Sequence, residues 1–584
     1  MCGFLGIFSS KISIDKEKKL KKAIQLLSHR GPDEEGSFKN ENTILLHKRL
    51  SIIDLKGGKQ PIENNDCVLV SNGEIYNDVL LRKQILDYRY KTGSDCESIL
   101  AVYIKYGING FKKLRGMYAF AIYDKKKKKM ILGRDPFGIK PLYFNLKNKE
   151  CLFSSEIQPI LKSRDNQIKL KRKKIIELLQ IQYNSGRNTI FKGILRVRPG
   201  ETIILDSKIN IEKSIIFEKS KNFRIDVPHK TKHLEKVLLD SVQVHQRSDV
   251  PFGLFFSGGI DSTIILYLMS KISKKKIISY SIIFEENNEP NEIIKLKEIA
   301  TRCNSEIHFI NFSENDFWNI LPQALKANDD PILDYAIVPT FKLAQVAKKD
   351  VKVILSGEGG DEIFAGYGRH RKIMRPFLNK SSFINSEMDK VDFLKKKFKG
   401  WDFDLNFNKT FNMNLDMTPL QRLQLFDCEE WLPNNLLIKL DRCLMANNLE
   451  GRTPFIDLDV FKNFFGINDK LKVKKGLGKF LLRSFLQTNM SSYNFLEKKR
   501  GFTVPIHNWI PRKSDELSDL LPKNKLLQKI LKTSEIRTMC IRSKRDKKFI
   551  IPVWRLLCLS IWYQVHFDNA IPRNNTFNIL SMQN

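Results

Sequence analysis

The sequence predicts a layered α+β domain followed by an α/β domain with a parallel sheet, and two patterns carry this prediction. Up to about residue 210, short β-like runs are separated by Gly, Pro and Asn, with only two helical stretches. From about residue 215, short apolar strands alternate with amphipathic helices, as crossover connections between parallel strands require. We therefore expect two units, residues 1–214 and residues 215–584.

The first unit is predicted to be rich in strands. Residues there group into short runs of β-branched, aromatic and aliphatic side chains bounded by turn-forming residues. Apolar residues at helical spacing mark the two helices, at 16–28 and 97–106. The expected strands lie at 43–46, 68–71, 118–123, 130–133 and 152–155.

The second unit shows the alternation expected of a parallel sheet. Strands are predicted at 252–256, 277–284, 306–310 and 351–355, and helices at 232–246, 262–270, 293–302 and 338–348. The chain after residue 432 is predicted to be mostly helical.

The composition argues against a nucleic-acid-binding protein and against a membrane-spanning protein. The chain has 584 residues, with 100 Lys plus Arg against 65 Asp plus Glu, a formal charge of +35. The lysines are spread along the sequence instead of forming one basic patch, so we expect no nucleic-acid partner as a main function. The most apolar stretch, 250–269, contains Asp261 at its centre, so no membrane span is expected. Nine scattered cysteines and no apparent secretory signal favour a reducing cytoplasmic location.

Cys2 directly follows the initiator methionine. Removal of Met1 would leave a thiol and an α-amine on one residue, and the amine could then act as the general base for that thiol. The plainer interpretation is an incidental small residue, which is the commoner fate of a lone cysteine. The sequence that follows Cys2 decides between the two.

Ordered motifs extend over about 150 residues after Cys2. They are HRGPD at 29–33, RLSIID at 49–54, NGEIYN at 72–77, SDCE at 94–97, GMYAFA at 116–121 and RDPFGIKPL at 134–142. Together with Cys2 they resemble the class II glutamine amidotransferase (glutaminase) domain. That resemblance implies an N-terminal-nucleophile fold, in which stacked β-sheets lie between helices.

The resemblance also implies roles for individual residues in cleaving the side-chain amide of glutamine. Cys2 would attack the carbonyl and form a thioester, while Asn72 and the backbone of Gly73 stabilise the oxyanion. Arg49 would hold the α-carboxylate of glutamine, and Asp95 with nearby Glu74 its α-ammonium group. The implied glutamine-binding set is Arg49, Asn72, Gly73, Glu74 and Asp95.

A second motif, SGGIDS at 257–262, lies between a predicted strand and a predicted helix. Glycines allow the backbone to approach a phosphate closely, and a helix N-terminus offers it free N–H groups. Asp261 would repel bare phosphate, so it is best explained as a ligand of Mg²⁺ that bridges phosphate oxygens. No Lys follows the glycines, which excludes a Walker A loop.

A similar patch, SGEGGDEIFAGY at 356–367, follows the predicted strand at 351–355. The SGGxDS pattern resembles the pyrophosphate loop of ATP-pyrophosphatases, and its combination with Cys2 resembles the glutamine-hydrolysing asparagine synthetases. Further motifs at 432–442, 450–457 and 499–509 extend the resemblance over nearly the whole chain. On this basis 1–214 is the glutaminase domain and 215–584 the synthetase domain.

The resemblance implies ATP-dependent amidation of L-aspartate through a β-aspartyl-AMP intermediate, with ammonia from L-glutamine passed from the first site. ATP and Mg²⁺ are the implied cofactors, with Asp261 and Asp361 as metal ligands. Glu358 would lie near the acceptor, and Lys499 would stabilise charge, although the alignment leaves Lys498 as an alternative. The implied ATP contacts are Phe255, Ser257, Gly258, Gly259, Asp261, Ser262, Ile282, Ser356 and Gly357.

Other functions also fit parts of the sequence. The same machinery could act on another carboxylate, such as a sugar acid or a modified peptide. An RNA-modifying enzyme would use the pyrophosphate loop but would leave the first 200 or so residues unexplained. A non-catalytic scaffold would be expected to have lost some of the motif residues. Assembly as a homodimer is an open expectation.

Overall fold

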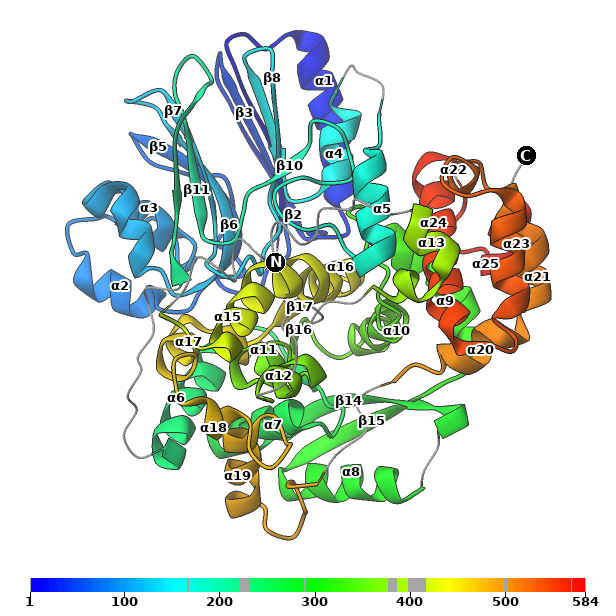
Figure 1. The fold of residues 1–584 in the computed structure, drawn as a ribbon. Helices are drawn as coiled ribbons and strands as arrows, with labels where there is room; N and C mark the ends of the chain where they lie inside the picture. The colour runs from blue at the N-terminus through cyan, green and yellow to red at the C-terminus, as the bar shows by residue number, and fades with distance from the viewer. Residues whose placement is uncertain are drawn as a thin grey trace.

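The computed structural model contains both kinds of domain that the sequence predicts (Figure 1). Two six-stranded antiparallel sheets come from the N-terminal part of the chain, and a five-stranded parallel sheet comes from the C-terminal part. The structure describes residues 2–164, 168–219, 230–287, 290–375, 386–397, 416–497, 503–568 and 570–582.

The first antiparallel sheet has β1 (Cys2–Ser9) at its centre, between β3 (Thr43–Arg49) and β9 (Glu150–Ser154). All eight residues of β1 are buried, because both faces of the strand are covered. Leu5 packs with the helices on one face, while Phe4 packs with the second sheet on the other. The sheet is completed by β2 (Glu34–Lys39), β8 (Tyr143–Lys147) and β10 (Leu195–Arg196).

The second antiparallel sheet stacks on the first and carries helices on its outer face (Figure 1). The predicted strands at 68–71, 118–123 and 130–133 are confirmed, and the first of them is more than twice as long as expected. The expected helix at 16–28 divides into α1 (Ile14–Ala23) and the 3-10 turn η1 (Ile24–Leu27). Helices α2 (Asp78–Gln84) and α3 (Glu97–Tyr106) cover the outer face, while α1 and α4 (Ile157–Lys162) cover the first sheet. The strands are, in sheet order, β12 (Ile211–Ile216), β11 (Glu201–Leu205), β7 (Lys129–Arg134), β6 (Gly116–Asp124), β5 (Cys67–Ile75) and β4 (Ile62–Glu63).

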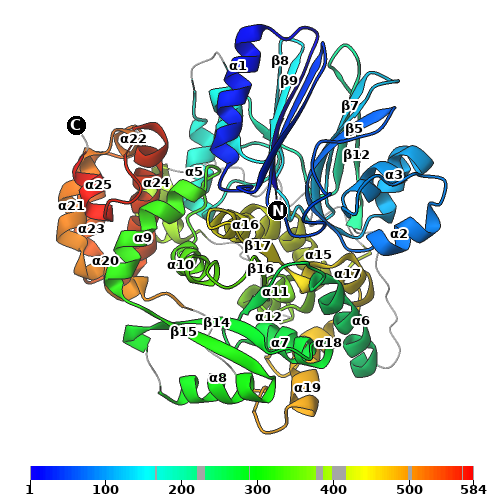
Figure 2. The same ribbon diagram turned by 180° about the vertical axis from the view of Figure 1, so that it is seen from behind.

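The parallel sheet has helices on both faces (Figure 2). Alternate residues of its strands point to opposite faces, so Ile354 packs toward α10 while Val353 and Leu355 pack toward α7. All four predicted strands are confirmed. The strands are, in sheet order, β15 (Ser305–Phe312), β14 (Ile277–Phe284), β13 (Phe252–Phe255), β16 (Val353–Leu355) and β17 (Glu450–Arg452). Helix α6 (Lys230–His245) precedes β13, and the helices between the strands include α7 (Ile260–Ile272), α8 (Pro290–Arg302), α9 (Glu314–Ala327) and α10 (Ile337–Ala347).

The chain after residue 432 is mostly helical, as predicted. A π-helical stretch, η7 (Asp427–Leu436), joins α15 (Pro419–Phe426) to α16 (Leu437–Met445). The longest of the described helices, α24 (Ile550–Phe567), lies in an apolar segment that has the length and composition of a membrane span, but 83% of its most apolar 18-residue window is buried, as in a core helix. The remaining helices include α5 (Arg172–Ile181), α11 (Gly360–Phe364), α12 (Gly368–Ile373), α13 (Asp392–Lys397), α17 (Leu458–Phe464), α18 (Asp469–Lys472), α19 (Phe480–Asn489), α20 (Ile506–Arg512), α21 (Ser514–Leu520), α22 (Lys525–Gln528), α23 (Thr533–Arg542) and α25 (Thr576–Ser581).

Candidate functional site

The structure places Cys2 beside Asn72, where the two antiparallel sheets meet. The backbone N–H of Cys2 donates to Oδ1 of Asn72 at 3.1 Å. The other end of that amide, Nδ2, is buried and has no hydrogen-bond partner in the described part of the chain. A buried N–H donor without a partner is costly unless a ligand or water uses it, and it is the kind of group that stabilises an oxyanion. Burial raises the pKa of the Cys2 thiol, so the thiol needs a base to become a nucleophile.

Gly73 follows Asn72 in β5 and lies against the neighbouring strand. A Cβ atom at this position would overlap the carbonyl oxygen of Met117, so only glycine allows β5 and β6 to approach this closely. The carbonyl of Gly73 accepts a hydrogen bond from Sγ of Cys96, at 3.4 Å. The motif around Asn72 is therefore held by backbone packing as well as by its side chains.

Arg49 lies opposite Cys2 in the β1–β3 register. Its Nη2 donates to the carbonyl oxygens of Ile53, at 3.1 Å, and Asp54, at 2.6 Å. Its Nη1 pairs with the carboxylate of Glu34 at 2.7 Å. The loop after β3 therefore fixes the direction of the Arg49 side chain. A substrate carboxylate that binds Arg49 would share its guanidinium with Glu34.

Asp95 and Glu74 form a pair of buried carboxylates near this site. Burial raises the pKa of Asp95 to about 6, although the backbone N–H of Ile75 donates to its carboxylate. Burial and the negative charge of Asp95 raise the pKa of Glu74 well above its usual value, against the opposing effect of Arg452. Nη2 of Arg452 lies 3.4 Å from Glu74. Nε of Arg452 also pairs with Glu450, at 2.6 Å, so this guanidinium is shared between Glu74 and Glu450. An α-ammonium group of a substrate could therefore add a favourable positive charge beside Asp95 and Glu74.

The second site lies at the carboxyl ends of β13 and β16, where the strand order of the parallel sheet reverses direction. Ligands of open α/β sheets bind in the crevice at such a switch point. The loop from Ser257 to Ser262 follows β13, and its two serine hydroxyls lie 3.3 Å apart. The loop that begins at Ser356 follows β16, and a Cβ atom on Gly357 would come within 2.9 Å of Cβ of Asp261. The two glycine-rich motifs, about 100 residues apart in the sequence, therefore touch.

Asp261 and Asp361 meet at this point, with Lys479 between them. Nζ of Lys479 pairs with Oδ2 of Asp261 and lies 2.8 Å from Oδ1 of Asp361. Burial raises the pKa of Asp261 to about 6, with the charge of Lys479 opposing that rise. The second carboxylate oxygen of Asp261 is buried without a hydrogen-bond partner in the described residues. Glycines line both carboxylates, and a Cβ on Gly360 or Gly366 would overlap them.

This arrangement fits a magnesium ion that is bound together with a nucleotide. Among the described residues there is no group of three or more His, Cys, Asp or Glu side chains that could hold a metal by itself. Mg²⁺ commonly takes one or two carboxylates and completes its shell with substrate phosphates and water. The unpartnered oxygen of Asp261 and the space kept open by the glycines are what such a site requires.

Lys439, Asp334 and Glu358 form another charged cluster beside these two loops. Nζ of Lys439 lies 3.1 Å from Asp334 and 3.8 Å from Glu358. Burial raises the pKa of Glu358. The charges of Asp334 and Glu358 raise the pKa of Lys439 despite its burial. The cluster offers both signs of charge to a small zwitterion.

The other predicted residues divide into those that the structure places and those that it does not. Phe255 ends β13 and Ile282 lies in β14, both partly buried against the core. The N–H of Ser356 donates to the carbonyl of Arg452 in β17, at 2.9 Å. Lys499, and the alternative Lys498, lie outside the described residues. Lys439 and Arg452 lie within the motifs at 432–442 and 450–457, but the sequence analysis assigned them no role at a site. Lys479 lies in none of the motifs, and its partners Asp261 and Asp361 are distant in the chain.

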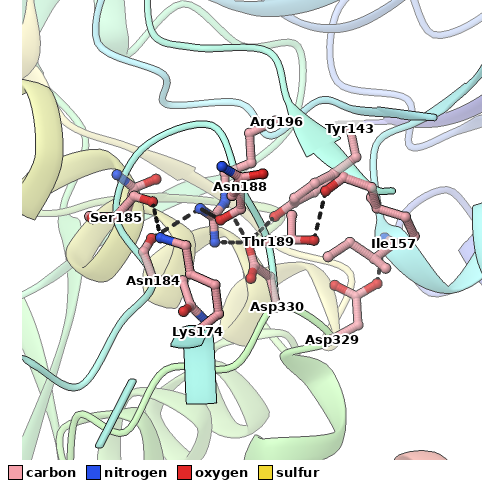
Figure 3. Close-up of polar contacts among 12 residues, drawn as sticks. Tyr143, Ile157, Lys174, Asn184, Ser185, Asn188, Thr189, Arg196, Asp329 and Asp330 are labelled. Atoms are coloured by element: carbon pink, nitrogen blue, oxygen red, sulfur yellow. Dashed lines mark hydrogen bonds and ion pairs between the residues drawn. The ribbon is translucent and has the colours of Figure 1, made fainter. Parts of the chain in front are cut away.

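The two halves of the molecule share a buried, charged interface. Arg30 is fully buried and pairs with Asp441 at 2.8 Å. Figure 3 shows a second cluster, in which Nε of Arg196 donates to Asp330 at 2.7 Å and the hydroxyl of Tyr143 donates to the same carboxylate at 3.1 Å. Beside it, Asp329 accepts from the backbone N–H of Ile157. These contacts fix the orientation of one half against the other.

Comparisons with known proteins agree with both halves of this description. A family model described as a glutamine amidotransferase domain matches residues 1–215, and one described as asparagine synthase matches residues 233–564. A relative named asparagine synthetase [glutamine-hydrolyzing] 1, from Bacillus subtilis, is 30% identical over 620 aligned residues that cover 97% of each chain. Asparagine synthetase B [glutamine-hydrolyzing] from Escherichia coli is 31% identical over 392 residues, which cover 63% of this chain and 65% of the relative.

Proposed function

The chain belongs to the asparagine synthase family, and from this premise we propose that it makes asparagine from aspartate, glutamine and ATP through a β-aspartyl-AMP intermediate. Glutamine-dependent amidation follows from the family. The observation that supports the adenylation step is the contact between the loops at 257–262 and 356–361, with Asp261 and Asp361 at the sheet's switch point. The relatives' names favour aspartate over a sugar acid or a modified peptide as the acceptor.

We propose residues 1–214 as the glutaminase domain and 215–584 as the synthetase domain. The antiparallel sheets end with β12 at Ile216, and the first helix of the parallel-sheet region begins at Lys230. The change of sheet type supports a division close to residue 214, although β12 continues two residues past it, to Ile216.

In the glutaminase half, the α-amine of Cys2, freed by loss of Met1, takes the thiol proton. The thiolate attacks the side-chain carbonyl of glutamine, and Nδ2 of Asn72 with the N–H of Gly73 stabilises the resulting oxyanion. The C–N bond then breaks, ammonia leaves with the proton, and a thioester remains on Cys2. Water hydrolyses the thioester to glutamate. Arg49 orients the α-carboxylate of glutamine, and Glu74 with Asp95 holds its α-ammonium.

In the synthetase half, the serine hydroxyls and backbone N–H groups of the loop at 257–262 hold the phosphates of ATP. Asp261 and Asp361 would hold Mg²⁺, which would neutralise phosphate charge when bound. Phe255 and Ile282 border the adenosine, and Ser356 with Gly357 borders the phosphates. Lys499 stabilises charge on the reacting phosphate, as the resemblance implies, and Lys479 supplies a further cation there.

The acceptor carboxylate attacks the α-phosphorus, and pyrophosphate leaves. We propose that Lys439 holds the α-carboxylate of aspartate while Asp334 and Glu358 hold its α-ammonium. Ammonia then attacks the acyl carbon, AMP leaves, and asparagine forms. Pyrophosphate release that requires ATP and aspartate, and that other carboxylic acids fail to support, would establish the acceptor.

Cys2→Ala tests the whole scheme. We expect it to abolish asparagine synthesis from glutamine and to leave synthesis from added ammonium intact, because only the first site loses its nucleophile. Cys540→Ala, which removes another buried thiol, serves as the matched control and should leave both activities intact. Loss of both activities in folded Cys2→Ala protein would contradict a scheme with two separate sites.

We also propose a cytoplasmic location and assembly as a homodimer. All nine cysteines are free and buried, which suits a reducing compartment. Light scattering of the purified protein would test the dimer.

A further inference from the structure

A short segment of the synthetase half, residues 245–249, contacts the loop that orients Arg49. Asp249 makes two hydrogen bonds to that loop. Its backbone N–H donates to the carbonyl of Ile52 at 3.0 Å. Its carboxylate accepts from the backbone N–H of Asp54 at 2.8 Å. Asp249, in the synthetase half, therefore both donates to and accepts from the backbone of a loop in the glutaminase half.

Asp54 is one of the residues that fix the direction of Arg49. Its carbonyl accepts from Nη2 of Arg49 at 2.6 Å, the shortest bond that this guanidinium makes. Its backbone has φ of 53°, in the left-handed region that a non-glycine residue keeps only when its surroundings hold it there. Its carboxylate accepts from the backbone N–H of Gly57, at 3.0 Å, and of Gly93, at 2.8 Å. The bond from the N–H of Asp54 to the carboxylate of Asp249 links this residue to the synthetase half.

The other end of the segment is fixed to the parallel sheet. Nη1 of Arg452, in β17, donates to the carbonyls of His245, at 2.9 Å, and Arg247, at 2.6 Å. The carbonyl of Arg452 in turn accepts from Ser356, in the loop of the proposed ATP site. Asp249 also lies three residues before β13, the strand that leads into Ser257. The segment is thus tied to both nucleotide-binding loops.

We propose that Asp249 is a positioning residue for the glutamine site, through which the synthetase half holds the loop that aims Arg49 at the substrate. The inference rests on the proposed role of Arg49 in binding the α-carboxylate of glutamine. Without the Asp249 carboxylate, the N–H of Asp54 loses its acceptor and the loop gains freedom. Glutamine then binds less well, while chemistry that starts from free ammonia does not involve this loop.

The test compares two substitutions in the full-length chain. Asp249 is exposed, so its replacement creates no cavity. For Asp249→Ala we expect a rise of roughly three- to tenfold in KM for glutamine, the effect of about one hydrogen bond. Synthesis from ammonium should keep its wild-type KM and kcat. Asp249→Asn should restore glutamine binding, because its amide oxygen can accept from Asp54.

Arg172→Ala provides a matched control. Arg172 also bridges the two halves from an exposed position, donating to the carbonyl of Lys529 at 2.7 Å, but it contacts neither site. Its loss should leave KM for glutamine unchanged. An unchanged KM in Asp249→Ala, or an equal loss with both nitrogen donors, would overturn the inference.

Arg49→Ala separates this inference from the proposed function. If Arg49→Ala greatly weakens glutamine binding while Asp249→Ala does not, the positioning role is wrong and the role of Arg49 stands. If Arg49→Ala also leaves glutamine binding unchanged, both ideas fail. A rise in KM in both variants, with the larger effect at Arg49, supports both.

Discussion

The amide of Asn72 offers the most direct test of the glutaminase site. Its Oδ1 accepts from Cys2 and its Nδ2 is buried with no partner in the described residues, so Asn72→Ala removes one existing bond and one unused donor. Removal of one oxyanion donor typically lowers kcat by about 10² to 10³, or roughly 2.7–4 kcal/mol. We expect a loss of that size in glutamate release from glutamine.

The same substitution should cost little stability. Losing the bond to Cys2 costs about 0.5–1.5 kcal/mol, and removing a buried donor that has no partner offsets part of that cost. Against a total stability of about 5–15 kcal/mol, the variant should remain folded. A thermal unfolding curve close to that of wild type would separate lost chemistry from lost structure.

The assay for Asn72→Ala measures glutamate release and, separately, asparagine formation from ammonium. Only the first should fall. Gln60→Ala is the matched control, because Gln60 is also a buried amide that accepts from β5, at the N–H of Ser71, yet it does not contact Cys2. A loss below about tenfold in Asn72→Ala, or an equal loss in Gln60→Ala, would refute the assignment of Nδ2 as an oxyanion donor.

Two further predictions concern charge. Lys479→Met leaves Asp261 and Asp361 without their shared cation. Pyrophosphate release with either nitrogen donor should therefore fall at least about 100-fold, while glutamate release persists. Retained pyrophosphate release would contradict the role of Lys479. Because burial raises the pKa of Asp95 to about 6, its carboxylate is ionised above that pH and protonated below it. KM for glutamine should therefore rise by up to about tenfold per pH unit below that value, whereas KM for ammonia, expressed as the concentration of free NH3, should show no such change. A flat glutamine profile between about pH 5 and 8 would argue against an α-ammonium contact at Asp95.

The fold was predictable where a strand or helix carries its own periodic pattern. β6 and β7 are bounded by turn-forming residues and were located to within a few positions. β1 was not recognised as a strand, because it contains two glycines and is buried on both faces, which removes the alternation of polar and apolar residues. β17 has only three residues, too few for any periodic pattern, and its place is set by pairing with β16.

The site residues divide in the same way. Residues within contiguous motifs, such as Cys2, Asn72 and Asp261, could be proposed from the sequence because each motif has a chemical reason for its order. Lys479 could not, since its partner Asp261 lies 218 residues away and the two meet only after the parallel sheet and α19 have formed. In the sequence alone, a lysine just before an apolar helix would be expected to be exposed to solvent.

The interface between the halves shows why charge in a sequence is a poor guide to its position in the fold. Arg30 and Asp441 would each be taken for surface residues, yet both are buried and paired across 411 residues of chain. A buried ion pair gains little net stability over an apolar contact, but removing one partner costs about 3–5 kcal/mol because the other charge is left unpaired. Such pairs therefore penalise every docking of the two halves except the one that matches each charge with its partner. In this matched arrangement Asp249 also contacts the loop that holds Arg49. The buried charge pairs therefore help to hold the glutamine pocket in a fixed orientation relative to the nucleotide-binding loops.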